Sequence, residues 1–217
     1  MPNPRFSQHN GSPRLPAPDL EKVPEKLVEA FVRSTDAFSL IEGDIGNIYR
    51  ALAHSPKLAE SWLRFAGYVA RRSGLTPRER ELAILRVGWL RSAEYEWAHH
   101  ARIARSVGLT DAEIRATTED LAARPWSECD RALLDATGQL VEDGDIDNAT
   151  WLALESFMTP QRLLDFVFTV GNYTLISMLV RAARVQLEPG VTRFAQEDDG
   201  EGNHERAAAP YGHPDGH

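Results

Sequence analysis

The residues of this chain best suited to acid–base chemistry lie between Glu81 and His100, in the segment ELAILRVGWLRSAEYEWAHH. Its second half gathers Tyr95, Glu96 and His99 in front of His100. Residues three or four apart share one face of a helix, so a helical segment would place Glu96 beside both histidines. A carboxylate, an imidazole and a phenol held together can move protons near neutral pH. The segment therefore predicts a proton-transfer site.

The same spacing has two other interpretations. A Glu and a His at helical spacing commonly form a solvated surface pair, worth a few tenths of a kcal/mol. Glu96 and His99 also match the Glu-x-x-His spacing of di-iron bundles, which need a second such motif and further Glu ligands. The other match, Glu201 to His204, falls in a predicted tail. We therefore prefer the acid–base interpretation and expect no metal and no cofactor.

The segment is similar to the core motif of the carboxymuconolactone decarboxylase family, which includes the alkyl hydroperoxidase D-like (AhpD-like) proteins. That motif is a Glu on one helix followed by a C-x-x-C-x-x-x-H run. In this chain Glu81 takes the Glu position, Ala93 and Glu96 take the two Cys positions, Tyr95 takes the relay position between them, and His100 takes the His position. The Y-E-W-x-x-H pattern resembles the decarboxylase-type branch of the family, which lacks the C-x-x-C.

The resemblance extends more loosely from Asn47 to Gly190. It includes R-A-L-A-H-S-P around His54, T-W at Trp151 and G-N-Y at Tyr173. It implies an all-α AhpD-like helical bundle, a small carboxylic acid or lactone as substrate, and a homo-oligomer, either a trimer or a hexamer. Five tryptophans and abundant Leu and Phe offer apolar surface for such subunit contacts.

Decarboxylation of a carboxylactone leaves a dienolate, whose charge must be stabilised and whose carbon must receive a proton. We expect His100 to be the acid, its pKa raised by Glu81 and Glu96. Alternatively, the two glutamates share a proton and one of them is the donor. Tyr95 could stabilise the enolate oxygen. The same groups suit isomerisation, hydration or lactone opening.

Three more residues are candidates for substrate binding. Arg86, beyond Glu81 on the same predicted helix, could anchor a substrate carboxylate. Trp97 and His99 could line the pocket, although packing in the core is an equally good interpretation of Trp97.

Two alternative functions follow from the resemblance. One is an alkyl hydroperoxidase-like, peroxiredoxin-type oxidoreductase, and the other is a non-catalytic oligomer that binds a small molecule. A thiol peroxidase needs a nucleophilic thiolate. Both motif Cys positions hold other residues, and Cys129 lies between Glu128 and Asp130, which would raise its thiol pKa. We therefore predict no thiol-dependent peroxidase activity.

Composition places the chain among soluble, cytoplasmic proteins. Its 42% hydrophobic and 26% charged residues are ordinary for a globular protein. A single cysteine fits a reducing compartment. We find no apolar run of membrane-spanning length and no signal peptide, so we expect no membrane contact. The net charge of −8 argues against a nucleic-acid partner.

The predicted organisation is one domain with two tails. Residues 1–18 contain five prolines and no acidic residue, which indicates a flexible, extended arm. Residues 19–193 form the all-α domain, with the core motif between 47 and 190. Residues 194–217 are expected to be a disordered acidic tail, whose His204, His213 and His217 are too scattered to form a metal site.

Helical periodicity and capping signals predict about eight helices. Thr76 and Thr110 open capping boxes, with a Glu three residues after each. Ser92, Ser127 and Asp147 are candidate N-caps. We find no alternating strand pattern. The expected helical segments are 20–34, 47–54, 56–72, 77–90, 92–107, 127–141, one containing 151, and 160–187, with the capping box at Thr110 between the fifth and the sixth.

Overall fold

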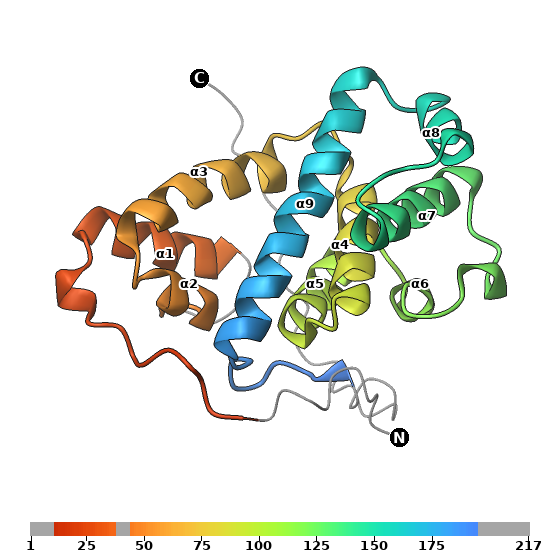
Figure 1. Cartoon of the computed structure of the whole chain (residues 1–217). Coiled ribbons are helices and arrows are strands. Elements are labelled where there is room, and N and C mark those ends of the chain that lie inside the picture. The colour runs from red at the N-terminus through yellow and green to blue at the C-terminus, as the bar shows by residue number, and fades with distance from the viewer. Residues whose placement is uncertain (1–10, 38–43, 195–217) are drawn as a thin grey trace.

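A computed structural model describes residues 11–37 and 44–194. In these residues the chain forms only helices, as the sequence predicts (Figure 1). The α-helices are α1 (Glu25–Ala37), α2 (Asn47–Leu52), α3 (Pro56–Arg71), α4 (Pro77–Leu90), α5 (Glu94–Ser106), α6 (Asp111–Ala116), α7 (Glu128–Glu142), α8 (Asn148–Glu155) and α9 (Pro160–Ala183). Two short 3-10 helices span Leu20–Lys22 and Leu121–Ala123.

Local capping sets most of the helix starts. The Thr76 hydroxyl accepts from the Glu79 backbone N–H, and the Glu79 carboxylate accepts from the Thr76 backbone N–H. Thr110 opens α6 in the same way, and the Ser127 and Asp147 side chains cap α7 and α8. These predicted caps are confirmed. The helix predicted from residue 20 instead begins at Glu25. Pro24 has no backbone N–H, so it interrupts a helix that starts earlier but is tolerated at the start of one.

The turn between α4 and α5 differs from the prediction. Ala93, without a side-chain cap, is the N-cap of α5, and Ser92 adopts a left-handed conformation with φ of 53°. The Ala93 backbone N–H donates to the Gly88 carbonyl at 2.8 Å. A Cβ at Gly88 would lie 3.2 Å from the Trp97 backbone nitrogen, so glycine permits this close approach. The tight turn brings the Glu81 helix against the His100 helix.

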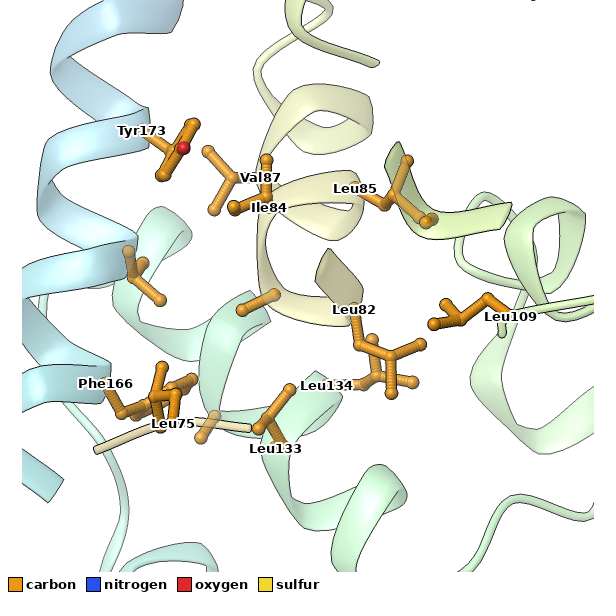
Figure 2. Packing of buried hydrophobic residues seen from close by; sticks show 14 of the residues in the cluster. Leu75, Leu82, Ile84, Leu85, Val87, Leu109, Leu133, Leu134, Phe166 and Tyr173 are labelled. Atoms are coloured by element: carbon orange, nitrogen blue, oxygen red, sulfur yellow. The ribbon is translucent and has the colours of Figure 1, made fainter. Parts of the chain in front are cut away.

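Two apolar clusters form the core, and α5 contributes to both. The larger cluster joins α4, α7 and α9, as Figure 2 shows for Leu82, Leu133, Leu134 and Phe166. The smaller cluster lies around α1, α2 and the first half of α3. In α5, Trp97 belongs to the larger cluster and Tyr95 to the smaller one. The polar residues of α5 therefore lie where the two clusters meet.

Helix α9 crosses the middle of the bundle and contacts α3, α4, α5, α7 and α8 (Figure 1). By length and composition it could cross a membrane, so the prediction that no apolar run reaches that length is wrong for this helix. However, 56% of its most apolar window is buried by the described part of the chain, as expected for a central bundle helix. Its outer face exposes four large apolar side chains: Leu164, Phe168, Leu175 and Met178.

The described ends of the chain are held against the bundle. The Arg14 backbone N–H donates to the Ala183 carbonyl at 2.9 Å, and His54 Nε2 lies 3.0 Å from the Pro16 carbonyl oxygen. The second half of the predicted flexible arm is thus anchored. Phe194, assigned to the tail from sequence, is buried and packs edge-on against Trp97. The rest of the arm and tail lies outside the described residues.

Candidate active site

Glu81 and His100 form a buried acid–imidazole pair between α4 and α5, here called the first pair. His100 Nδ1 lies 2.7 Å from Glu81 Oε2, and both side chains are almost inaccessible to solvent. The other carboxylate oxygen, Glu81 Oε1, lies 3.4 Å from Arg80 Nε. The His100 ring packs edge-on against Tyr173 of α9, at 4.9 Å between centroids. Charge and packing together fix the imidazole, with Nδ1 turned to Glu81 and Nε2 turned away from it.

Glu96 lies on the Nε2 side of His100. Its Oε2 is 3.9 Å from that nitrogen, one helical turn earlier on α5. The residue is only 5% exposed and makes no hydrogen bond to another described residue. Burial raises the pKa of Glu96 to about 7, with His100 opposing the rise and Glu188 adding to it. A carboxyl group with such a pKa can hold or release a proton near neutral pH.

Glu188 and His99 form a second buried acid–imidazole pair, with 2.6 Å between Glu188 Oε2 and His99 Nε2. Glu188 Oε1 accepts from the Tyr95 hydroxyl at 2.7 Å and from the Asn47 backbone N–H at 2.8 Å. Burial favours a raised pKa for Glu188, but the hydrogen bonds led by His99 and Tyr95 outweigh it and hold the pKa below the usual value. Burial lowers the pKa of His99. The second pair is therefore a neutral imidazole donating to a carboxylate anion.

Both histidines and Glu96 border one cavity, which has a volume of about 70 Å³. That is room for several water molecules, since one needs about 10–15 Å³ on the same measure. The carboxylates of Glu81 and Glu188 lie behind the histidines and do not line the cavity. Helices α1, α2, α3, α5 and α9 supply the walls, which include Tyr49, Trp62, Asn172 and Tyr173.

Asn172 places an amide at the cavity wall. The Trp62 indole N–H donates to Asn172 Oδ1 at 3.0 Å. This hydrogen bond orients the amide, so that its Nδ2 end, which has no partner among the described residues, remains available as a donor. An N–H group beside a cavity of this kind can stabilise a developing oxyanion.

Arg71, at the end of α3, brings a positive charge to the cavity. The residue is exposed and forms no ion pair within the described ranges. Its guanidinium folds over Gly67, where an added Cβ would lie 2.9 Å from Nη2. Glycine thus leaves room for the guanidinium at the edge of the cavity.

The structure brings the four expected catalytic residues together, with Glu81 reaching the cavity through His100. Their chemical roles stay predictions. The proposed role of Tyr95 conflicts with the geometry, because its hydroxyl hydrogen is donated to Glu188. It is therefore not available to an enolate oxygen.

Of the three expected substrate-binding residues, only His99 lines the cavity. Arg86 instead donates to the backbone carbonyls of Thr117 and Glu119, at 2.9 and 3.2 Å. Arg86 follows Glu81 by five residues on α4, so the two side chains project about 140° apart around the helix axis. Arg86 therefore points away from the face that carries Glu81. Trp97 is buried in the larger core cluster, because one residue beyond Glu96 lies on another helical face.

Sequence reasoning missed Glu188, Arg71 and Asn172. Asn172 lies in the G-N-Y segment that carries part of the resemblance, so a signal for it existed. Glu188 gives no local signal, since it follows α9 and contacts His99 across 89 positions of sequence. Within the described residues, no cluster of three or more His, Cys, Asp or Glu side chains is arranged to hold a metal ion.

The described residues thus form a helical bundle in which two consecutive helices hold a buried Glu–His pair, and this is the fold of a solved AhpD core. The model of the carboxymuconolactone decarboxylase family matches residues 56–139, which confirms the resemblance seen in the sequence over that segment. This match covers α3 to most of α7 and includes the first pair. Glu188 and Asn172 lie beyond it.

Several solved structures share the fold. A peroxidase-related protein from Ralstonia eutropha JMP134, described as an alkylhydroperoxidase AhpD core, matches with a TM-score of 0.71 at 18% identity, covering 82% of this chain and 93% of that one. A peroxidase-related protein from Silicibacter sp. TM1040 has the same TM-score and coverage at 16% identity. The debrominase Bmp8, in complex with 2,3,4-tribromopyrrole, has a TM-score of 0.68 at 14% identity, covering 86% and 95%. The comparison with curated proteins found no match.

Proposed function

We propose that this protein is a cofactor-independent acid–base enzyme, which decarboxylates a small carboxylactone or keto acid or carries out a related proton transfer. The observation that carries the proposal is Glu96. It is a carboxyl group without a hydrogen bond among the described residues, buried beside a cavity, with its pKa raised to about 7. Keeping such a group buried without a hydrogen bond costs stability, so its retention beside a cavity points to chemistry.

In the proposed reaction, carbon dioxide leaves and its bonding electrons remain on the substrate as a dienolate. The Asn172 amide N–H stabilises the developing oxygen charge. The protonated carboxyl group of Glu96 then donates its proton to carbon. His100, held by Glu81, lies next to the resulting carboxylate and can return a proton to it from solvent. Glu96 thereby takes the role of donor, which sequence reasoning left open between His100 and either Glu81 or Glu96.

A substrate carboxylate needs a cation near the cavity. Arg71 replaces Arg86 in this role, because its guanidinium borders the cavity. The aromatic side chains of Tyr49, Trp62 and Tyr173 suit a small, planar substrate.

The test is a screen of carboxylactones and β-keto acids for carbon dioxide release. Activity should fall as pH rises through about 7, because Glu96 must be protonated to act. The substitution Glu96→Gln should remove turnover, whereas Glu155→Gln on the exposed face of α8 should not. If several acids bind but none reacts, the protein is a non-catalytic binding module.

A peroxidase is the alternative suggested by the names of two structural neighbours. Cys129 is exposed in the first turn of α7 and does not border the cavity. We therefore expect no turnover of organic hydroperoxides. A peroxidase activity that disappears in Cys129→Ser would overturn the acid–base proposal.

We also propose that the protein works as a homo-oligomer, a trimer or a hexamer, in the cytoplasm. The exposed apolar side chains of α9 support subunit contact, because large apolar patches commonly mark interaction surfaces. Light scattering at micromolar concentration should show a species larger than 24.2 kDa. A monomer throughout the concentration range would refute this assembly.

A further inference from the structure

We propose that His99 is a base of this site and Glu188 the residue that positions it, so that the cavity holds a base and an acid together and shifts a proton between two carbons of a β,γ-unsaturated lactone. This inference deepens the proposed function and rests on it in one respect only, which is the assignment of Glu96 as the acid. The assignment of His99 and Glu188 rests on their own geometry.

Hydrogen bonding fixes the tautomer of His99. Both oxygens of Glu188 accept hydrogen bonds, and its side chain is fully buried. A carboxylate that accepts from Tyr95 and the Asn47 backbone N–H requires a donor at His99 Nε2 as well. The proton of the neutral ring therefore lies on Nε2, and Nδ1 carries a lone pair.

That lone pair is available for chemistry. His99 lines the cavity, and its Nδ1 makes no hydrogen bond to a described residue. The Tyr95 ring packs edge-on against the imidazole at 4.5 Å between centroids, and Tyr95 is itself tied to Glu188. Ring orientation is thus fixed at two points. Such a preorganised imidazole is suited to general base catalysis.

Burial and, to a lesser extent, neighbouring charges keep His99 neutral. Burial is the main cause of its lowered pKa, and His100 and Arg102 act in the same direction. Glu188, the one group that favours the protonated ring, does not outweigh them. Near neutral pH the cavity therefore offers an unprotonated His99 and, at Glu96, a carboxyl group that is partly protonated.

The reaction is balanced without an oxidant or a reductant. His99 Nδ1 removes a proton from the carbon between the carbonyl and the double bond, and the electrons of that C–H bond enter a dienolate. The far carbon of the dienolate then takes the proton of Glu96, so that the double bond moves into conjugation with the carbonyl. Solvent returns a proton from His99 to Glu96 and restores both groups.

The first experiment needs no substrate. NMR of the histidine ring nitrogens, assigned with a His99→Gln variant, should show His99 protonated at Nε2 and not at Nδ1. Glu188→Gln should populate both tautomers, because an amide can donate as well as accept. A wild-type His99 protonated at Nδ1 would overturn the positioning role.

The second experiment uses α-angelica lactone in deuterium oxide, with the rate in buffer subtracted. The wild type should incorporate deuterium next to the carbonyl and move the double bond. His99→Gln should lower both rates by about 10²-fold or more, the usual contribution of a positioned base. Glu96→Gln should slow the double-bond shift more than the exchange. His54→Gln, at an exposed histidine away from the cavity, is the control.

The outcomes separate the two proposals. Full exchange in His99→Gln, or no reaction of the lactone with the wild type, would overturn the inference whatever the carbon dioxide screen shows. Exchange that depends on His99 without carbon dioxide release from any carboxylactone would support the inference and refute decarboxylation.

Discussion

The two acid–imidazole pairs of this site are built from different parts of the chain. The first pair joins consecutive helices across a tight turn, 19 positions apart, inside the segment matched by the family model. The second pair joins α5 to residues beyond α9, outside that segment. In the first, the carboxylate holds Nδ1, and in the second it holds Nε2. Adjacent histidines on one helix are thus held in opposite ways, which suits them to different proton transfers.

Of the substitutions within the two pairs, removal of the imidazole of the first pair should have the largest effect. His100→Ala should lower turnover by about 10²–10⁴-fold, because it removes the group that returns a proton to Glu96. Substrate affinity should change far less, since the proton moves only as the transition state forms. Steady-state kinetics with the substrate found in the screen would measure both, with His54→Ala as the control. Full turnover in His100→Ala would exclude the first pair from the reaction.

The second pair should matter more for folding. Glu188→Ala should lower the free energy of unfolding by about 3–5 kcal/mol, because it breaks a buried pair and leaves Tyr95 and Asn47 without their acceptor. Glu81→Ala should cost less, since it leaves one buried partner, His100, and its other partner, Arg80, is partly exposed and can bind water. Urea denaturation of both variants, with the surface variant Glu155→Ala beside them, tests this order. Equal losses in the two pairs would contradict it.

Glu96 lies between the two pairs, and its ionised carboxylate should lower the free energy of unfolding although the residue is needed for activity. Its pKa is raised from 4.5 to about 7 on folding, so the folded state binds more protons in that range and stability falls as pH rises through it. A rise of this size corresponds to about 3 kcal/mol above the upper pKa. Glu96→Gln should therefore be more stable than the wild type at about pH 8, and similar to it below about pH 4.5. Thermal unfolding across pH would reveal the convergence, and a constant difference would refute the raised pKa.

The smallest expected effect distinguishes the two arginines. Arg71→Gln should raise KM about fivefold with little change in kcat, since an exposed charge contributes up to about 1 kcal/mol. Arg86→Gln should leave KM unchanged and lower stability by about 1–2 kcal/mol, because Arg86 donates to two backbone carbonyls. A raised KM in Arg86→Gln and an unchanged KM in Arg71→Gln would instead assign the binding of the substrate carboxylate to Arg86.

Several features of this protein are set by its sequence alone. The capping boxes at Thr76 and Thr110 depend on residues three apart, and helical periodicity is equally local, so both were predictable. The spacing of Glu96 and His100 likewise followed from one helical turn. The family motif added Glu81, because its distance along the chain matches a known pattern.

Tertiary packing decided the rest. Glu188 meets His99 only because α9 crosses the bundle and returns the chain to α5, and no local pattern encodes a contact over 89 positions. Burial between two apolar clusters, rather than the residue type, raises the pKa of Glu96. The choice of Arg71 over Arg86 depends on which helical face turns to the cavity, and that is fixed by how α3 and α4 pack against their neighbours. Sequence thus determined which groups could act, and packing determined which of them meet.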